Sequence, residues 1–180
     1  QLLDWLATHQ PDVMVLQETK LTDDKFPQAE IEAAGYHASW FGQKTYNGVA
    51  LLTRDAATDV VKNMPGFEDP SARVIAGTVN GVRMIGVYMP NGEAPDSDKF
   101  QYKMRWLVAL REWLRAELAA HPNLVLMGDF NIAPEDRDVH DPVAWAGQIL
   151  CTPEERAHFA GLVELGLVDA FRLFDQPPKS

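Results

Sequence analysis

The dipeptide Asn80-Gly81 constrains the fold of this chain more than any other short segment. It separates two apolar runs rich in β-branched residues, Val74 to Val79 and Val82 to Tyr88. Asn and Gly both tolerate the positive φ angles of a tight two-residue turn, so the pair is the strongest short signal for a β-hairpin. The sequence therefore predicts an antiparallel pair of strands and argues against a purely parallel, doubly wound sheet.

Other strands and several helices are expected around this hairpin. Helical spacing of apolar residues predicts a long amphipathic helix over Asp98 to Ala120, with Ser97 or Asp98 as its N-cap, and this helix must pack on a sheet. Alternation of strands and helices with one antiparallel hairpin favours an α/β sandwich. Further strands are predicted at Val13 to Leu16, Tyr36 to Phe41, Val49 to Thr53 and Leu124 to Met127, further helices near Leu2 to Leu6, Gln28 to Ala34 and Pro153 to Leu165, and a polar loop at Asp129 to Pro142.

Composition indicates a folded protein in a reducing compartment. Hydrophobic residues make up 46% of the 180 residues and charged residues 23%, which excludes intrinsic disorder and fits one domain over residues 1–180. A single cysteine, Cys151, leaves no partner for an internal disulfide, so we expect a cytoplasmic location. No apolar run approaches the roughly 20 residues that span a bilayer, so no membrane association is expected.

The net charge opposes a nucleic-acid partner held by charge alone. The chain has 16 Lys and Arg against 26 Asp and Glu, which gives a net charge of -10. Proteins that grip nucleic acid electrostatically usually present a basic face. A metal-dependent nuclease, however, must gather carboxylates at its site, where the bound cation meets the phosphate. Net charge therefore does not decide between these classes.

Polar side chains follow three of the predicted strands directly. Glu18 comes after the first strand, Tyr88 and Asn91 follow the hairpin, and Asp129 and Asn131 follow the strand at Leu124. Each position alone is more often a solvated residue or a turn than a site. The conjunction of all three at strand ends, where a rigid scaffold passes into loops, makes them candidates for one functional site.

The ordered motifs resemble the exonuclease III family of abasic-site endonucleases, within the endonuclease/exonuclease/phosphatase superfamily. The resemblance covers nearly the whole chain. The motifs are Gln17-Glu18-Thr19, Tyr46 to Ala50, the Tyr-x-Pro-Asn element from Tyr88 to Asn91, Gly128-Asp129-Phe130-Asn131, and Ile132 to Val139. The resemblance implies a sandwich of two mixed β-sheets flanked by helices, and a hydrolase of the exodeoxyribonuclease III type that takes part in DNA repair.

The resemblance also implies roles for the strand-end residues. Glu18 becomes a ligand of Mg²⁺, or of Mn²⁺ in its place, with Asp129 and Asn131 also at the metal. Asp129 orients and activates the attacking water, and Tyr88, Asn91 and Asn131 hold the scissile phosphate. A hard cation such as Mg²⁺ needs only one or two carboxylates, because water and substrate phosphate complete its shell. The implied substrate is double-stranded DNA with abasic sites or 3′ ends, bound by a monomer.

The family pattern extends beyond both ends of this chain. It normally opens with a strand that carries a metal-site Asn and closes with strands that carry an Asp and an Asp-His pair. No counterparts precede Gln1 or follow Ser180, and Pro177 to Ser180 form no closing element. We therefore expect the central part of a nuclease domain, incomplete at both ends and inactive as an isolated fragment.

Several other polar residues have a structural as well as a functional interpretation. Asp138 and Asp141 are expected to brace their loop, because the acidic run around them lacks the glycine of a calcium loop. Trp145 is either an aromatic DNA contact or part of the core. The five histidines are expected at the surface, and the basic residues either contact phosphate or form solvated helix faces: Lys44, Lys99, Lys103, Arg105 and Arg111.

Two other functional classes remain open. A phosphoinositide phosphatase or a sphingomyelinase of the same superfamily would share the metal Glu and the Asp-x-Asn element. A DNA-binding domain without catalytic activity would keep the fold of the superfamily but not its catalysis. The Tyr-x-Pro-Asn element favours the DNA repair branch, and intact carboxylates at strand ends argue against a purely structural domain.

Overall fold

The computed structural model describes residues 1–176, so the expectation for Pro177 to Ser180 lies outside the described part. The chain divides into two compact units. Unit 1 consists of Gln1–Tyr88 and Glu117–Asp129, and unit 2 of Met89–Ala116 and Phe130–Ser180. The expected single domain over residues 1–180 stays a prediction, and each unit is described by itself.

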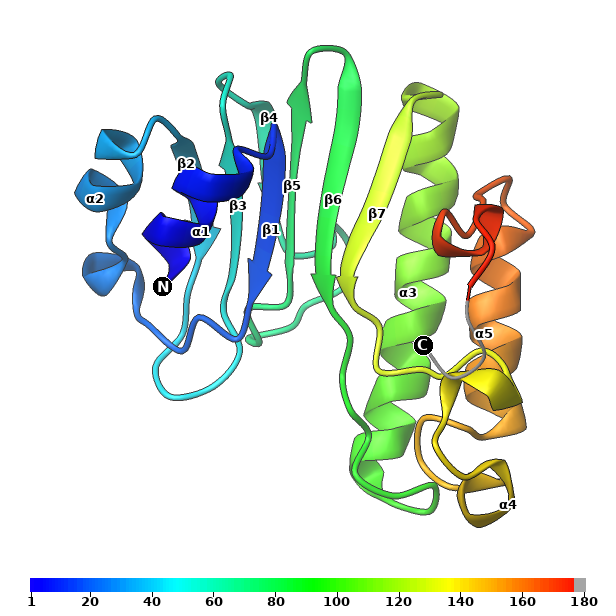
Figure 1. Ribbon diagram of the computed structural model, residues 1–180. Helices are drawn as coiled ribbons and strands as arrows, with labels where there is room; N and C mark the ends of the chain where they lie inside the picture. The colour runs from blue at the N-terminus through cyan, green and yellow to red at the C-terminus, as the bar shows by residue number, and fades with distance from the viewer. Residues whose placement is uncertain (177–180) are drawn as a thin grey trace. The chain divides into compact units, whose positions relative to one another are not determined.

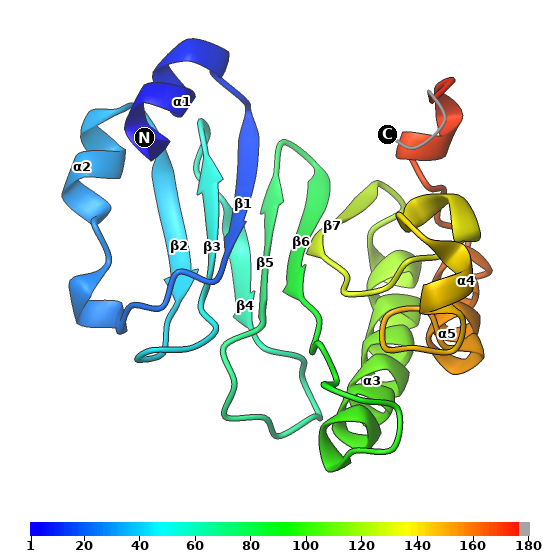
Figure 2. The ribbon, with the colours of Figure 1, turned by 60° about the horizontal axis from the view of Figure 1, so that its bottom comes forward.

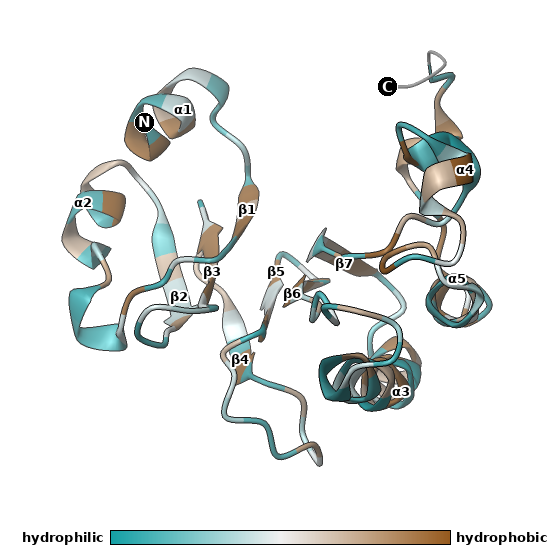
Figure 3. Cartoon of the chain, turned by 90° about the horizontal axis from the view of Figure 1, so that it is seen from below, coloured by the Kyte–Doolittle hydropathy of each residue, from teal (hydrophilic) through white to brown (hydrophobic). Residues whose placement is uncertain are grey.

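One sheet of unit 1 has three strands in the order β1-β3-β2, with antiparallel pairing throughout. Its strands are β1 (Val13–Gln17), β2 (His37–Phe41) and β3 (Val49–Thr53). On β3, Ala50 and Leu52 face an apolar cluster that includes Leu6 and Ile31. Those two residues come from the short helices α1 (Leu2–His9) and α2 (Gln28–Ala33), which cover the outer side of this sheet (Figure 3).

The other sheet of unit 1 has four strands in the order β4-β5-β6-β7 (Figure 2). The strands are β4 (Thr58–Lys62), β5 (Val74–Val79), β6 (Val82–Tyr88) and β7 (Leu124–Asp129). The predicted hairpin is confirmed, since β5 pairs antiparallel with β6 while Asn80 and Gly81 adopt φ angles of 49° and 77°. Strand β7 pairs with β6 in parallel, so this sheet is mixed.

The two sheets of unit 1 pack face to face, which confirms the predicted α/β sandwich. Val49 and Leu51 of β3 form an apolar cluster with Ile75 of β5. At the centre Gly86 admits the side chain of Val15, because a Cβ on Gly86 would lie 2.5 Å from Val15 Cγ1. Of the two sheets, only the four-stranded one is mixed; the described strands of the other are all antiparallel.

Strand β4 was not predicted from the sequence. Four of its five residues are exposed, so it lacks the apolar pattern on which a strand prediction rests. Its pairing with β5 is interrupted between Thr58 and Val61, where Asp59 takes a positive φ of 50°. Such a bulge and such polarity are typical of an edge strand that avoids pairing with other chains.

Unit 2 contains most of the long helix α3 and the helices that follow β7. Helix α3 spans Asp98–Ala120 as predicted, and its first turn is capped by Ser97, whose Oγ accepts a hydrogen bond of 3.1 Å from Phe100 N. Helix α5 (Pro153–Val163) ends two residues before the expected boundary, and α4 (Pro142–Trp145) begins where the predicted loop ends. Single 3-10 turns lie at Asp23–Lys25, Asp136–Asp138 and Phe171–Leu173.

The expected packing of α3 on a sheet would involve both units, so it stays a prediction. Its buried side chains include Phe100, Trp106, Leu107, Leu110 and Leu114, a stripe at helical spacing. Among the helices of residues 1–176, none combines the length and the apolar character that crossing a membrane requires.

Candidate active site

Three strands of unit 1 end on the same side of the sandwich, as the arrowheads of β1, β6 and β7 show (Figure 1). Tyr88 is the last residue of β6 and Asp129 the last of β7, and the parallel register pairs them directly. Glu18 follows the last residue of β1. The sequence prediction that these three residues lie at comparable strand ends is therefore confirmed, while their catalytic roles stay predictions.

Glu18 is held as a carboxylate and Tyr88 as a neutral phenol. Lys20 Nζ lies 2.8 Å from Glu18 Oε2, and this contact, followed by a hydrogen bond with Tyr88, lowers the pKa of Glu18 below its ordinary 4.5. Burial, and next the hydrogen bond to Glu18, raises the pKa of Tyr88 above its ordinary 10.0. At neutral pH the pair therefore offers a negative charge and an adjacent hydroxyl donor.

Arg73 fixes the orientation of Tyr88. Its guanidinium carbon lies 5.0 Å from the centroid of the Tyr88 ring, and its Nη1 donates to the Tyr88 carbonyl at 3.2 Å. The Tyr88 amide in turn donates to the Arg73 carbonyl at 2.8 Å. A cation placed over the ring face limits ring rotation, so the phenol keeps its direction. Arg73 could not be identified from the sequence, because its contact with Tyr88 depends on the register of β5 and β6.

The backbone around Glu18 is strained and braced by the neighbouring loop. Glu18 adopts a φ of 54°, a left-handed conformation that costs a residue with a side chain about 1 to 3 kcal/mol. The next residues are held by Gly48 and Asn47, whose carbonyls accept from Thr19 N at 3.3 Å and Lys20 N at 2.9 Å. A Cβ on Gly48 would lie 2.1 Å from Thr19 Oγ1. The Asn-Gly element of the Tyr46 to Ala50 motif thus holds the segment that carries Glu18.

Gly128 allows β7 to approach β6 just before Asp129. It adopts a φ of 135°, and a Cβ at this position would lie 2.0 Å from the carbonyl oxygen of Val87. Only glycine fits such a conformation and such a close contact. The glycine in the Gly-Asp-Phe-Asn motif therefore sets the position from which the Asp129 side chain leaves the strand.

In unit 2 the two candidate asparagines form one hydrogen-bonded group. Asn91 Nδ2 lies 3.3 Å from Asn131 Oδ1, and Asn131 Nδ2 donates to the carbonyl of Met89 at 2.9 Å. Glu93 N donates to Asn91 Oδ1 at 3.1 Å, and Asn131 has a φ of 47°. The structure thus brings together Asn91 and Asn131. Their place relative to Glu18, Tyr88 and Asp129 involves both units and stays a prediction.

Trp145, the remaining candidate, is 38% exposed on α4. This exposure excludes the interpretation of Trp145 as a core residue. Its expected contact with DNA stays a prediction.

The donor set suits a hard cation with few protein ligands. Within residues 1–176, no group of three or more His, Cys, Asp or Glu side chains is arranged to hold a metal. Magnesium does not need such a group, because one or two carboxylates suffice when water and phosphate supply the remaining oxygens. Glu18 offers a carboxylate whose pKa is lowered by Lys20, which lies 2.8 Å from its Oε2, and by the hydrogen bond with Tyr88. The use of Glu18 and Asp129 as the carboxylates of a metal site stays a prediction.

The acidic run that follows the Gly-Asp-Phe-Asn motif is structural, as predicted. Asp138 accepts a hydrogen bond from Glu135 N at 2.9 Å and pairs with Arg172. Asp141 caps α4 by accepting from the amides of Val143 and Ala144 at 3.1 and 3.0 Å. Both carboxylates are therefore engaged in bracing the loop.

Two predictions about basic residues need correction. Lys103 was expected to contact phosphate or to lie on a solvated face of α3, but its side chain is fully buried and pairs with Glu155. Among the histidines, His9, His37 and His140 are exposed as expected, whereas His121 and His158 are partly buried. Burial, and then the charge of Arg111, lowers the pKa of His158 below its ordinary 6.5.

Comparison with known proteins identifies the family of this chain. The model of the Endonuclease/Exonuclease/phosphatase family matches residues 1–174. Exodeoxyribonuclease III of Haemophilus influenzae is 34% identical over 184 residues, which cover 96% of this chain and 69% of that protein.

Solved structures show the same similarity. The 3′ phosphatase NExo from Neisseria, bound to a product DNA hairpin, is 50% identical to this chain with a TM-score of 0.95. The match covers 96% of this chain and 68% of the NExo chain. An AP endonuclease from Archaeoglobus fulgidus is 34% identical with a TM-score of 0.90, and the match covers 95% of this chain and 66% of that protein. The chain spans about two thirds of the length of each relative. It therefore belongs to the endonuclease/exonuclease/phosphatase family, in the branch of the exodeoxyribonuclease III and AP endonuclease relatives.

Proposed function

We propose that this chain carries the central part of a Mg²⁺-dependent DNA repair nuclease that hydrolyses phosphate esters at 3′ ends and at abasic sites. The observation that carries the proposal is the meeting of Glu18, Tyr88 and Asp129 at neighbouring strand ends of unit 1. Relatives support the DNA substrate, since one is named an exodeoxyribonuclease III, another an AP endonuclease, and a third a 3′ phosphatase with product DNA bound.

Each residue has a role that its environment suits. Glu18, held ionised, anchors the metal, and bound Mg²⁺ or Mn²⁺ supplies Lewis-acid stabilisation of charge on the phosphate. Asp129 orients the attacking water and accepts its proton, as a general base placed at a rigid strand end can. Tyr88, held neutral, donates a hydrogen bond to a non-bridging phosphate oxygen.

The asparagines supply neutral donors to the same phosphate. The amides of Asn91 and Asn131 carry no charge, so they can approach a phosphate without disturbing the ionisation of the carboxylates. Trp145, exposed on α4, offers an aromatic face to the DNA beside the cleaved bond. We further propose that the protein acts as a monomer in the cytoplasm, where its lone and buried Cys151 stays reduced.

A substrate panel tests the proposal on the full-length protein. It comprises a duplex with an internal abasic site, a duplex with a 3′ phosphate, a recessed 3′ hydroxyl end and a phosphoinositide. We expect hydrolysis of at least one DNA substrate that stops with a chelator and returns with Mg²⁺, and no release of phosphate from the lipid. Phosphoinositide hydrolysis alone, or DNA binding without cleavage on any substrate, would overturn the assignment.

A further inference from the structure

The side chains of Lys103 and Glu155 form an ion pair in unit 2 that is fully buried, with both side chains 0% exposed. Burying two charges costs more desolvation free energy than their attraction usually returns, so an apolar pair of similar volume is often as stable. A buried pair such as this one is therefore poorly explained by stability alone. Its hydrogen bonds indicate another role.

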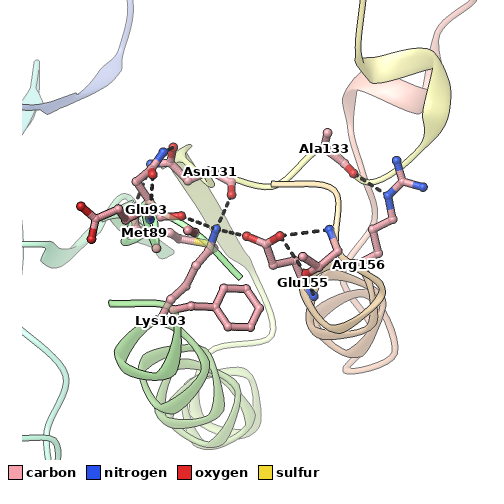
Figure 4. Close-up of polar contacts among 12 residues, drawn as sticks. Met89, Glu93, Lys103, Asn131, Ala133, Glu155 and Arg156 are labelled. Atoms are coloured by element: carbon pink, nitrogen blue, oxygen red, sulfur yellow. Dashed lines mark hydrogen bonds and ion pairs between the residues drawn. The ribbon is translucent and has the colours of Figure 1, made fainter. Parts of the chain in front are cut away.

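The ammonium group of Lys103 donates to the two candidate asparagines. Its Nζ lies 2.6 Å from the carbonyl oxygen of Asn131 and 3.1 Å from that of Asn91, and it also contacts Glu155 Oε1 (Figure 4). A lysine ammonium has three donors in total. Two of these contacts fix backbone carbonyls of residues proposed to hold the phosphate.

Glu155 holds the ammonium in place from α5. Its Oε2 accepts from Thr152 N at 3.1 Å and from Thr152 Oγ1 at 2.8 Å, while its own amide donates to Thr152 Oγ1. This capping box fixes Glu155 in the first turn of the helix. The carboxylate that orients Lys103 is thus itself rigid, because both of its oxygens have partners.

Close packing leaves the Lys103 stem little freedom. A Cβ on Gly92 would lie 3.1 Å from Lys103 Cδ and 2.9 Å from Ile149 Cδ1. Gly92 directly follows Asn91, so the loop after β6 closes over the lysine. A shift of the ammonium group would therefore move the backbone at Asn91, to which it is hydrogen-bonded.

We propose that the Lys103–Glu155 pair positions the side-chain amides of Asn91 and Asn131 so that they point toward the DNA phosphate. This proposal rests on the proposed function. Asn131 adopts a left-handed φ of 47°, and its amide is joined to Asn91 and to the Met89 carbonyl. Two carbonyls fixed by one cation keep this group in one arrangement. Loss of the cation frees both loops and misdirects the amides.

Unit 1 offers a matched control in the pair of Arg83 and Glu117. Their side chains are 3% and 16% exposed, with Arg83 Nε 2.6 Å from Glu117 Oε2. Arg83 also donates to the Asp59 carbonyl at 2.8 Å and to Thr78 Oγ1 at 3.2 Å. None of these partners is a candidate site residue, so its removal should affect stability without affecting the amides.

The experiment compares Lys103→Met, the double variant Lys103→Met/Glu155→Leu, and Arg83→Met in the full-length protein. The readouts are the folded fraction, kcat and KM on DNA with Mg²⁺, and the NMR signals of the Asn91 and Asn131 side-chain amides. The double variant should stay folded yet lose about 100-fold in kcat, because small misplacements cost that much, with a smaller change in KM and broadened amide signals. Arg83→Met should unfold more easily but keep kcat per folded molecule and both amide signals.

The single variant Glu155→Gln tests the proposal if the double variant does not fold. Glu155→Gln keeps the shape and one acceptor oxygen but removes the charge that holds Lys103, and its amide nitrogen cannot accept a hydrogen bond from Lys103 or Thr152. It should shift the Asn91 and Asn131 amide signals and lower kcat, while the amides of unit 1 stay unchanged. Unchanged kcat and amide signals in a folded double variant, or in Glu155→Gln, would overturn the proposal. A wild-type protein that cleaves no DNA overturns the proposed function instead, and the amide signals still test the positioning.

Discussion

Tyr88 and Asp129 are register partners at the ends of the parallel strands β6 and β7, so a phenol and a carboxylate leave the sheet beside each other. Tyr88 also shares a hydrogen bond with Glu18, which follows β1 in the facing sheet. Two carboxylates and one phenol therefore lie at the ends of regular strands, not in long loops. A site fixed on rigid elements keeps its geometry with little loss of conformational entropy on binding.

Replacement of Glu18 by Gln should raise the Mg²⁺ concentration for half-maximal activity by at least about tenfold, because a neutral amide is a poorer ligand for a hard cation. The melting temperature should change little, since Glu18 is exposed. A magnesium titration of DNA cleavage measures the effect. Glu30→Gln on the exposed side of α2 serves as the control and should titrate like the wild type. Identical titrations for all three proteins would remove Glu18 from the metal site.

Replacement of Tyr88 by Phe should weaken transition-state stabilisation by about 1 to 3 kcal/mol, the contribution of one hydrogen bond to a charged group. Because the pKa of Tyr88 is raised above 10.0, the phenol stays a donor throughout the alkaline range below that value. The ratio of wild-type to variant kcat/KM should therefore stay constant from neutral pH to about pH 9. Wild-type rates in Tyr88→Phe would assign the residue to packing.

Replacement of Gly128 by Ala should destabilise the protein more than replacement of Gly66 by Ala. Both glycines have positive φ angles, 135° and 80°, so both variants incur backbone strain, about 1 to 2 kcal/mol at Gly66. Only at Gly128 does the new Cβ collide with a backbone carbonyl, that of Val87, whereas nothing lies within 4 Å at Gly66. The free energy of unfolding in urea, measured for both variants, separates the backbone strain that they share from the collision that occurs only at Gly128. Equal losses in the two variants would mean that β7 can move away from β6 without penalty.

Replacement of His158 by Gln should remove part of the acid sensitivity of the fold. Burial lowers the pKa of His158 below 6.5 in the folded state, so the unfolded state binds the proton more readily. The associated stability is present above pH 6.5 and is lost as the pH falls through the lower, folded pKa. Melting temperatures between about pH 8 and pH 5 should converge for wild type and variant at the alkaline end and favour the variant at the acid end. Parallel curves would show that His158 is protonated equally in both states.

Much of the fold follows from local patterns. The hairpin at Asn80-Gly81 and the helix over Asp98 to Ala120 carry strong signals in the sequence, and both occur as predicted. Strand β4 escaped prediction because it is mostly exposed and bulged, which leaves no apolar alternation to detect. Its pairing with β5 is a tertiary contact that periodicity does not report.

The candidate site was predictable where it lies at strand ends. Glu18, Tyr88 and Asp129 follow apolar runs, so their placement could be read from the sequence. The pairing of Lys103 with Glu155 could not, because the partners are 52 residues apart. One signal was present: Lys103 lies three residues after Phe100 and four before Leu107, within the buried stripe of α3. A charge at such a position indicates a buried partner.

The most direct test of the account is single-turnover cleavage of DNA by the Asp129→Asn variant of the full-length protein. If Asp129 accepts the proton of the attacking water, the rate of the chemical step should fall at least about 100-fold while the affinity for DNA changes far less. The variant should also keep its melting temperature, since the amide has nearly the same shape as the carboxylate. A wild-type rate, or a loss of DNA affinity with the chemical step intact, would contradict the assignment of catalysis to this strand end.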